Sequence, residues 1–261
     1  MTVFTAEHRL DGDRSRTPVA FMSALFAGGW IWEHPFQNLA AAGWPVLRTQ
    51  EPICALDRTV AGSMERLGDA FLESCADAGF DEVVVCANSM GGLVAIDLAG
   101  RYPERVRAIV VSGAPGLSAD PDVGLSVDRR ASVRLDSDDF RERMLAALFH
   151  RGRYFSEEQL ERTAELLRRP SSMVSMARSL KATRRYSIGA ALDKVTCPSL
   201  YVWGRFDRMT PIEPWRELVA HRPHTEFVAV DDCGHIPMIE KAEEYTTRLE
   251  RFLTGTALPT R

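Results

Sequence analysis

The chain has 261 residues, of which 45% are hydrophobic, and it carries a formal net charge of -4 at pH 7. This length and hydrophobic content allow one large core, while the acidic balance and the lack of a basic stripe exclude a protein that binds nucleic acid. No apolar run reaches the ~18 residues of a membrane span, and the first residues lack the basic and apolar blocks of a signal peptide.

The cysteines form an odd set without CxxC spacing: Cys54, Cys75, Cys86, Cys197 and Cys233. Such a set predicts reduced thiols and a cytoplasmic location. His221 and His224 lack the spacing of a zinc site, and there is no phosphate-binding loop. We therefore expect no metal, no cofactor, no nucleic-acid partner and no membrane partner. The expected partner is a small-molecule substrate, and a homodimer is left open.

Strand and helix patterns alternate along the first part of the chain. Residues 2–10 and 18–25, joined by the turn Asp11-Gly12-Asp13, predict a hairpin whose second arm is buried. Further strands are predicted at 44–47, 83–85 and 106–111, and helices at 35–42, 59–78 and after Ser89 to about residue 103. This alternation predicts a largely parallel sheet covered by helices on both faces.

The alternation stops between residues 117 and 193, where three helix patterns and no clear strand pattern occur. These helices are predicted over 137–149, from the capping box Ser156-Glu157-Glu158-Gln159 to before Pro170, and over 171–185. We interpret this insertion as a helical lid over the carboxyl ends of the strands, where ligands of open α/β sheets bind; the alternative is an appendage that packs elsewhere. The chain ends with strands at 199–204 and 226–230 and helices at 211–221 and 242–253.

The segment from Glu82 to Ala95 predicts a strand, a sharp turn and a helix, with Ser89 at the apex of the turn. A turn this tight needs small neighbours, here Ala87 and Gly91, and it holds the serine in sparsely populated backbone space with its hydroxyl exposed. The N-terminus of the following helix suits a negative charge that develops beside this hydroxyl. The alternative is an N-capping serine at an ordinary turn.

Two further polar residues, Asp207 and His235, follow predicted strands in the second half of the chain. Serine, acid and histidine in this order at strand ends predict a catalytic triad, in which His235 takes the proton of Ser89 and Asp207 orients the imidazole. Asp231 and Asp232 are competing acids, but they are too close to His235 in sequence to reach behind its ring easily. The alternatives are a helix-capping aspartate and a surface histidine in a turn.

Three motifs carry a resemblance to a known family: Asn88-Ser89-Met90-Gly91-Gly92, Trp203-Gly204-Arg205-x-Asp207-Arg208 and Gly234-His235-x-Pro237-x-x-Glu240. In these motifs the chain resembles the α/β-hydrolase fold superfamily, in particular the meta-cleavage-product C–C hydrolases and small serine esterases, and the resemblance covers essentially its whole length. It implies an α/β-hydrolase fold with a mostly parallel sheet of eight strands and a helical cap. The core domain is then formed by residues 1–116 and 194–261, and the cap by residues 117–193.

The family usually carries His-Gly after the first central strand, and Ser23-Ala24 stands at this place in the chain. By the same resemblance, the backbone N–H of Met90 and that of either Leu25 or Ala24 form an oxyanion hole. Loss of one such donor typically lowers turnover by ~10²–10³-fold. A distorted loop here would therefore mean a slow or repurposed enzyme.

The expected activity is that of a cofactor-free serine hydrolase that cleaves an ester or thioester of a small, mostly apolar metabolite through an acyl-enzyme. One alternative is a C–C bond hydrolase or cyclase of the meta-cleavage type on the same triad. Another is a non-catalytic ligand receptor on a hydrolase scaffold. Candidate substrate-binding residues are Trp30, Trp32, Asn88 and Ile236 in the core, with Phe149, Phe155 and Met176 in the insertion.

Overall fold

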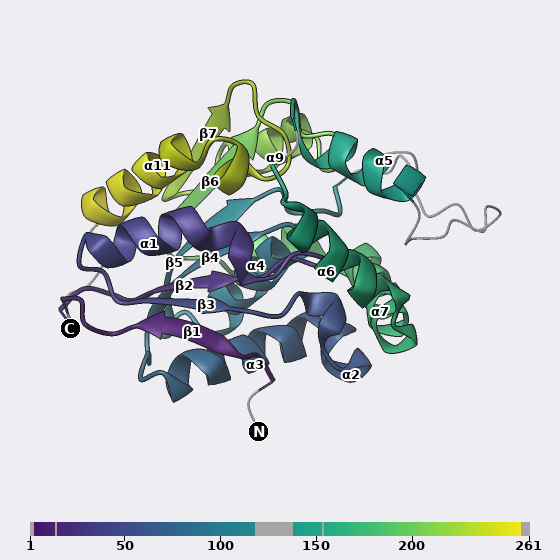
Figure 1. Ribbon diagram of the computed structural model, residues 1–261. Helices are drawn as coiled ribbons and strands as arrows, with labels where there is room; N and C mark the ends of the chain where they lie inside the picture. Colours follow the sequence, from purple (N-terminus) through teal and green to yellow (C-terminus); the bar gives the residue numbers. More distant parts are fainter. Residues whose placement is uncertain (1–2, 14, 118–137, 153, 257–261) are drawn as a thin grey trace.

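A computed structural model describes residues 3–13, 15–117, 138–152 and 154–256, and Figure 1 shows one sheet with helices packed around it. The strands are β1 (Ala6–Arg9), β2 (Val19–Met22), β3 (Val46–Thr49), β4 (Val83–Asn88), β5 (Val106–Ser112), β6 (Ser199–Gly204) and β7 (Thr225–Val230). They lie in the order β1-β3-β2-β4-β5-β6-β7, and all neighbours are parallel except β1 and β3. The mostly parallel sheet is confirmed, with seven strands in the described residues where eight were expected.

The predicted N-terminal hairpin is wrong, because β1 and β2 do not pair with each other. β1 lies antiparallel to β3, with Ala6 opposite Thr49, and β3 separates it from β2. The turn after β1 bonds instead to the loop before β3, where the N–H of Asp13 donates to the carbonyl of Gly43 at 2.8 Å. All residues of β2 are buried, whereas β1 is half-buried or exposed. The apolar strand therefore takes an inner position and the polar strand takes the edge.

Helices connect the strands. They are α1 (Glu33–Ala41), α2 (Arg58–Ala61), α3 (Met64–Asp77), α4 (Met90–Arg101), α5 (Asp138–Leu148), α6 (Glu157–Arg168), α7 (Pro170–Arg185), α8 (Ile188–Leu192), α9 (Ile212–Val219), α10 (Pro237–Glu240) and α11 (Ala242–Gly255), with 3₁₀ turns η1 (Gly29–Trp32) and η2 (Ile53–Ala55). The single helix predicted over 59–78 is in fact two, because Ser63 caps α3 by accepting the N–H of Arg66 at 3.3 Å. The short helices α8 and α10 were not predicted, since they are too short to show a period.

Alternate side chains of the inner strands point to opposite faces of the sheet, as β4 illustrates. Val84 and Cys86 pack in a core cluster with side chains of α1 and α11, whereas Val83, Val85 and Ala87 pack with side chains of α3, α4 and α9. Both faces are therefore covered, as predicted. Because helices cover both faces, a functional site is expected at the loops that follow the carboxyl ends of the strands.

The inserted helices α5 to α8 lie between β5 and β6 in the chain. Figure 1 shows α5, α6 and α7 gathered on the side to which the parallel strands point. α7 packs on α2 and η2, where the Ser175 hydroxyl donates to the Leu56 carbonyl at 2.8 Å and the Ser179 hydroxyl to the Ala61 carbonyl at 2.7 Å. Residues 118–137 of the predicted insertion, and residue 153, lie outside the described residues. Within the described ranges, none of the helices has the length and apolar character needed to cross a membrane.

Candidate active site

Ser89 lies at a sharp turn between β4 and α4, with φ 54° and ψ -130°. A positive φ is uncommon outside glycine and costs on the order of 1–3 kcal/mol. The turn is held by the N–H of Ser89, which donates to the carbonyl of Ser112 at 2.8 Å. A Cβ at Gly91 would lie 2.9 Å from the carbonyl oxygen of Ser23, so the turn requires glycine there. The strand, turn and helix predicted around Ser89 are all present.

Asp207 and His235 meet in the loops that follow β6 and β7. His235 Nδ1 lies 2.9 Å from Asp207 Oδ2, and the two side chains are 3% and 1% exposed. Asp207 Oδ1 accepts the backbone N–H groups of Met209 and Thr210 at 2.8 and 2.9 Å, and the Thr210 hydroxyl donates to Asp207 Oδ2 at 2.6 Å. The carboxylate is thus fixed by its own turn, in a position from which it can orient the imidazole.

The backbone of His235 is held from two sides. Its N–H donates to the carbonyl of Leu148, at the end of α5, at 2.7 Å, and its carbonyl accepts Nδ2 of Asn88 at 3.1 Å. The imidazole lies against Gly113, where a Cβ would come within 2.6 Å of the ring Cε1. Gly113 directly follows Ser112, whose carbonyl binds the serine turn. The histidine ring and the serine turn are therefore supported by the same short stretch of backbone.

Ser89 and His235 are not joined by a hydrogen bond. In the described part of the chain, neither Ser89 Oγ nor His235 Nε2 has a hydrogen-bond partner. Catalytic hydrogen bonds are often long before substrate binds and shorten in the substrate complex. The site therefore offers a hydroxyl without a partner and an imidazole whose other nitrogen is bound to a buried carboxylate.

The two backbone N–H groups predicted for the oxyanion hole, those of Met90 and Leu25, have no acceptor among the described residues. Met90 is the first residue of α4, so its N–H has no partner inside the helix. The alternative donor Ala24 requires a correction, because its N–H donates to the carbonyl of Ala27 at 2.9 Å. The N–H of Leu25 donates to no described residue, so Leu25 stays the predicted second donor.

Ser23 occupies the position where the resemblance places a histidine. Its buried hydroxyl donates to the Thr49 carbonyl at 2.9 Å, and its N–H donates to the Thr49 hydroxyl at 3.0 Å. The next two carbonyls, of Ala24 and Leu25, each accept a backbone N–H from η2 at 3.0 Å. The changed loop is thus tied to β3 and η2 by hydrogen bonds rather than left distorted.

Two predicted substrate-binding residues, Trp32 and Asn88, are buried and bonded to backbone. Trp32 is 0% exposed, and its indole N–H donates to the Met22 carbonyl at 2.9 Å. Asn88 is 1% exposed, and its Nδ2 donates to the carbonyls of Ser112 and His235. Both side chains donate N–H groups to backbone carbonyls and so hold the loops of the site.

Three other predicted residues are brought together across the two parts of the chain. The ring centroid of Phe155 lies 4.6 Å from that of Trp30 and 4.9 Å from that of Phe149. Ile236, next to His235 in the chain, belongs to the same buried cluster as Phe149. Met176, on α7, belongs to the other buried cluster, which also contains Leu25 and Met90.

The competing acids point away from the histidine. The side chains of Asp231 and Asp232 are 76% and 60% exposed. Asp231 pairs with Arg205, and Asp232 lies 3.6 Å from Nε2 of His150. Asp207 is therefore the acid that contacts His235, as its greater separation from His235 in the sequence suggested.

The sequence assigned no role to two residues of this region, Thr210 and Glu240, although Glu240 ends the third motif of the resemblance. The Asp207-x-x-Thr210 spacing is a signal for a local turn, because an aspartate often accepts N–H groups from residues two and three positions ahead. Glu240 has no such signal, since its carboxylate accepts N–H groups from a segment 90 residues away in sequence.

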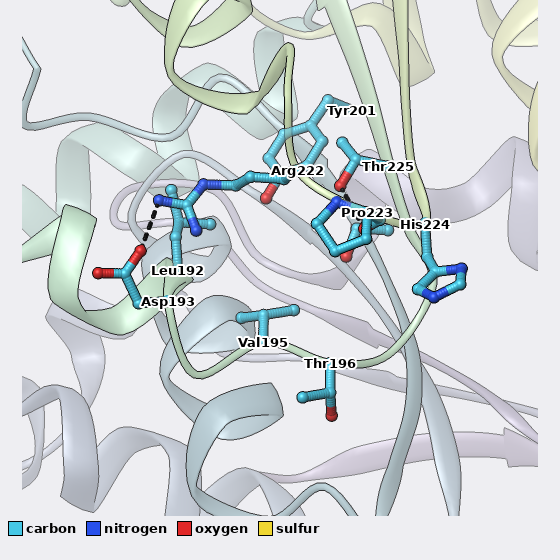
Figure 2. A pocket seen from close by; sticks show the side chains of 10 residues that line it. Leu192, Asp193, Val195, Thr196, Tyr201, Arg222, Pro223, His224 and Thr225 are labelled. Carbon is cyan, nitrogen blue, oxygen red and sulfur yellow. Dashed lines mark hydrogen bonds and ion pairs between the residues drawn. The ribbon is translucent and has the colours of Figure 1, made fainter.

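A pocket of about 370 Å³ lies elsewhere, at the amino ends of β6 and β7. Figure 2 shows Tyr201, Arg222 and His224 around it, with Arg222 paired to Asp193 at 2.9 Å. The parallel strands separate this pocket from the serine turn, which is at their carboxyl ends. No group of three His, Cys, Asp or Glu side chains that could hold a metal ion occurs within the described ranges.

Comparison with known proteins finds hydrolases by sequence and by structure. A family model described as alpha/beta hydrolase fold matches residues 17–242. A 2-hydroxy-6-oxononadienedioate/2-hydroxy-6-oxononatrienedioate hydrolase of Dechloromonas aromatica is 27% identical over 239 residues, which cover 87% of this chain and 83% of the relative. Among solved structures, a bacterial membrane phospholipase A has a TM-score of 0.80 at 19% identity, covering 97% of this chain and 87% of its own. An esterase from Thermogutta terrifontis has a TM-score of 0.71 at 20% identity, covering 97% and 93%.

Proposed function

Because the chain belongs to the alpha/beta hydrolase fold family, we propose that it is a serine hydrolase that cleaves an ester or thioester of a small, mostly apolar metabolite. The observation that carries the proposal is the buried contact of 2.9 Å between His235 Nδ1 and Asp207 Oδ2, with the strained Ser89 turn on the adjoining backbone. A buried acid behind an imidazole holds the tautomer that can accept a proton on Nε2.

The proposed reaction has two halves. In the first, Ser89 Oγ attacks the acyl carbon while its proton passes to His235 Nε2, and the N–H groups of Met90 and Leu25 bind the oxyanion. His235 then gives this proton to the leaving alcohol or thiol, which leaves an acyl-serine. In the second half, His235 takes a proton from water, the hydroxide attacks the acyl carbon, and Ser89 regains its proton as the acid leaves. Asp207 stabilises the imidazolium in both halves.

The proposed substrate class follows from the side chains around the loops. Trp30, Phe149 and Phe155 form an aromatic cluster that joins the core to the insertion, and Ile236 is buried beside His235. We propose that residues 117–193 form a lid over the site and that this cluster contributes to an apolar wall beneath it. Such walls favour apolar acyl groups over charged ones.

A second candidate is hydrolysis of a C–C bond in a vinylogous keto acid on the same residues. It is favoured by the similarity to the relative from Dechloromonas aromatica, a 2-hydroxy-6-oxononadienedioate/2-hydroxy-6-oxononatrienedioate hydrolase. A non-catalytic receptor is disfavoured, because a strained serine and a buried Asp–His pair would serve no purpose in binding alone. The cysteines are free thiols, which supports a cytoplasmic location.

Parallel assays separate these candidates. We expect p-nitrophenyl acetate and butyrate to be hydrolysed with a burst of p-nitrophenol equal to the enzyme concentration, because an acyl-enzyme accumulates. The dienoate 2-hydroxy-6-oxohexa-2,4-dienoate should be consumed at least tenfold less efficiently, as measured by kcat/KM. The reverse ranking would favour the C–C hydrolase, and no turnover of either class would favour the receptor.

A further inference from the structure

Glu240, at the end of the short helix α10, carries a carboxylate that the proposed chemistry does not use. The residue is 7% exposed. Its Oε2 accepts the backbone N–H of Gly234 at 2.7 Å, and its Oε1 accepts the N–H groups of His150 and Arg151 at 3.0 and 3.1 Å. The His150 N–H is also 3.2 Å from Oε2. One buried carboxylate thus binds three backbone N–H groups, one from a residue six positions away and two from a segment about 90 residues away in the chain.

No lysine, arginine or histidine forms an ion pair with Glu240 in the described part of the chain. A buried carboxylate is tolerated only when hydrogen bonds replace its hydration, and hydrogen bonds to an ionised oxygen are shorter and stronger than neutral ones. The three N–H groups therefore replace the hydration of the carboxylate, and the carboxylate in turn fixes the backbone that carries them.

The two segments that Glu240 joins are the loop carrying His235 and the residues leaving α5. Gly234 directly precedes His235, and the His235 N–H donates to the carbonyl of Leu148 at 2.7 Å. The approach is close, since a Cβ at Gly234 would lie 2.6 Å from the carbonyl oxygen of Leu148. Through these contacts the histidine loop and the segment 148–151 are connected in both directions.

We infer that Glu240 is a positioning residue, which fixes the backbone of His235 and couples the place of its imidazole to the segment that leaves α5. This inference rests on the proposed role of His235 as the general base. Phe149 lies in the same segment and packs on Phe155, so Glu240 also connects the base to the aromatic cluster. A shift of this segment would move the base and one wall of the site together.

The test compares Glu240→Gln with Glu243→Gln, an exposed glutamate at the start of α11. Glutamine keeps the size of the side chain, but its NH₂ group meets backbone N–H groups that need an acceptor. In Glu240→Gln we expect kcat for p-nitrophenyl acetate to fall by about 10- to 100-fold, because small displacements of a catalytic group cost this much. KM should change less than about twofold, since the substrate is bound by other residues. Glu243→Gln should match the wild type in both constants.

Amide hydrogen exchange of the wild type tests the contacts without any variant. The amides of His150, Arg151 and Gly234 should be strongly protected, and in Glu240→Gln they should exchange at least tenfold faster. Full exchange of these amides in the wild type would overturn the inference even if the variant failed to fold. An unchanged kcat in folded Glu240→Gln would also overturn it. A wild type that hydrolyses no ester and no dienoate would instead refute the proposed function, while the protection of the three amides would still report on the contacts.

Discussion

The strand-end loops and the inserted helices are held in different ways. In the strand-end site, the Asp207 carboxylate accepts N–H groups of its own turn, and the Ser89 N–H donates to Ser112 on the adjacent strand. The insertion packs on the core through buried apolar side chains and through polar contacts between residues far apart in the chain, such as Ser175 with the Leu56 carbonyl, 119 positions away. The turns of Asp207 and Ser89 are therefore specified locally, whereas the place of His235 and of the insertion depends on the assembled fold.

From this difference we first expect that replacing Asp207, the acid at the strand ends, lowers catalysis more than replacing a residue of the insertion. In Asp207→Asn we expect kcat for p-nitrophenyl acetate to fall by roughly 10⁴-fold, because the amide cannot hold the same tautomer of His235. The matched control is Asp231→Asn, since Asp231 is an exposed acid four residues before the histidine. Equal losses in the two variants, measured by steady-state kinetics, would contradict the assignment of the acid.

Replacing Asn88 tests whether a buried side-chain amide affects catalysis by holding the backbone of Ser112 and His235. In Asn88→Ala the carbonyls of Ser112 and His235 lose a shared donor, so we expect a loss of about 1–3 kcal/mol in the free energy of unfolding. Because His235 is then less firmly held, kcat should fall by roughly tenfold. Asn38→Ala, which removes an exposed amide of α1, is the control for urea denaturation and kinetics. An Asn88→Ala variant that changed KM alone would return this residue to the substrate pocket.

The anchors of the insertion should affect stability more than chemistry. Ser175→Ala and Ser179→Ala each remove a buried hydroxyl that donates to a core carbonyl, at an expected cost of about 1 kcal/mol. The exposed Ser171→Ala should cost less than about 0.5 kcal/mol. Urea unfolding gives these values, and kcat for a small ester should stay within about twofold of the wild type. A large fall in kcat with unchanged stability would show that α7 takes part in catalysis.

Replacing or modifying a cysteine should have the smallest effect on activity. Burial raises the pKa of Cys54 from 9.0 to about 12 and that of Cys197 to about 11, and it also raises the pKa of Cys233, next to the histidine loop. These thiols stay protonated at pH 7, so native protein should react slowly with a disulfide reagent and Cys233→Ala should keep full activity. Because the folded pKa values are the higher ones, stability should fall as the pH rises above about 9. Rapid modification of Cys233 at pH 7 would contradict this account.

Much of the fold and of the candidate site could be predicted from the sequence. Ser89, Asp207 and His235 each belong to a short turn pattern after an apolar run, and the order of these turns in the chain indicates that they meet at one edge of a parallel sheet. The strand between residues 83 and 88 and the helix after Ser89 follow from the same local signals.

The rest could not be predicted, because it depends on contacts between distant residues. The pairing of β1 with β3 is decided by which strand is buried, and the turn sequence that follows β1 does not indicate that β1 lies at the edge of the sheet. Trp32 looked like a pocket residue because its loop is apolar, but the bond from its indole N–H to Met22 places it in the core. The role of Glu240 depends on a segment that only the folded insertion brings near.

The most direct test is labelling with a fluorophosphonate, followed by mass spectrometry of the peptides. The account predicts one adduct per chain on Ser89 in the wild type, and at least 10³-fold slower labelling in His235→Ala, since the serine is a weak nucleophile without its base. An adduct on another residue, or equal labelling rates in the two proteins, would contradict the claim that His235 activates Ser89.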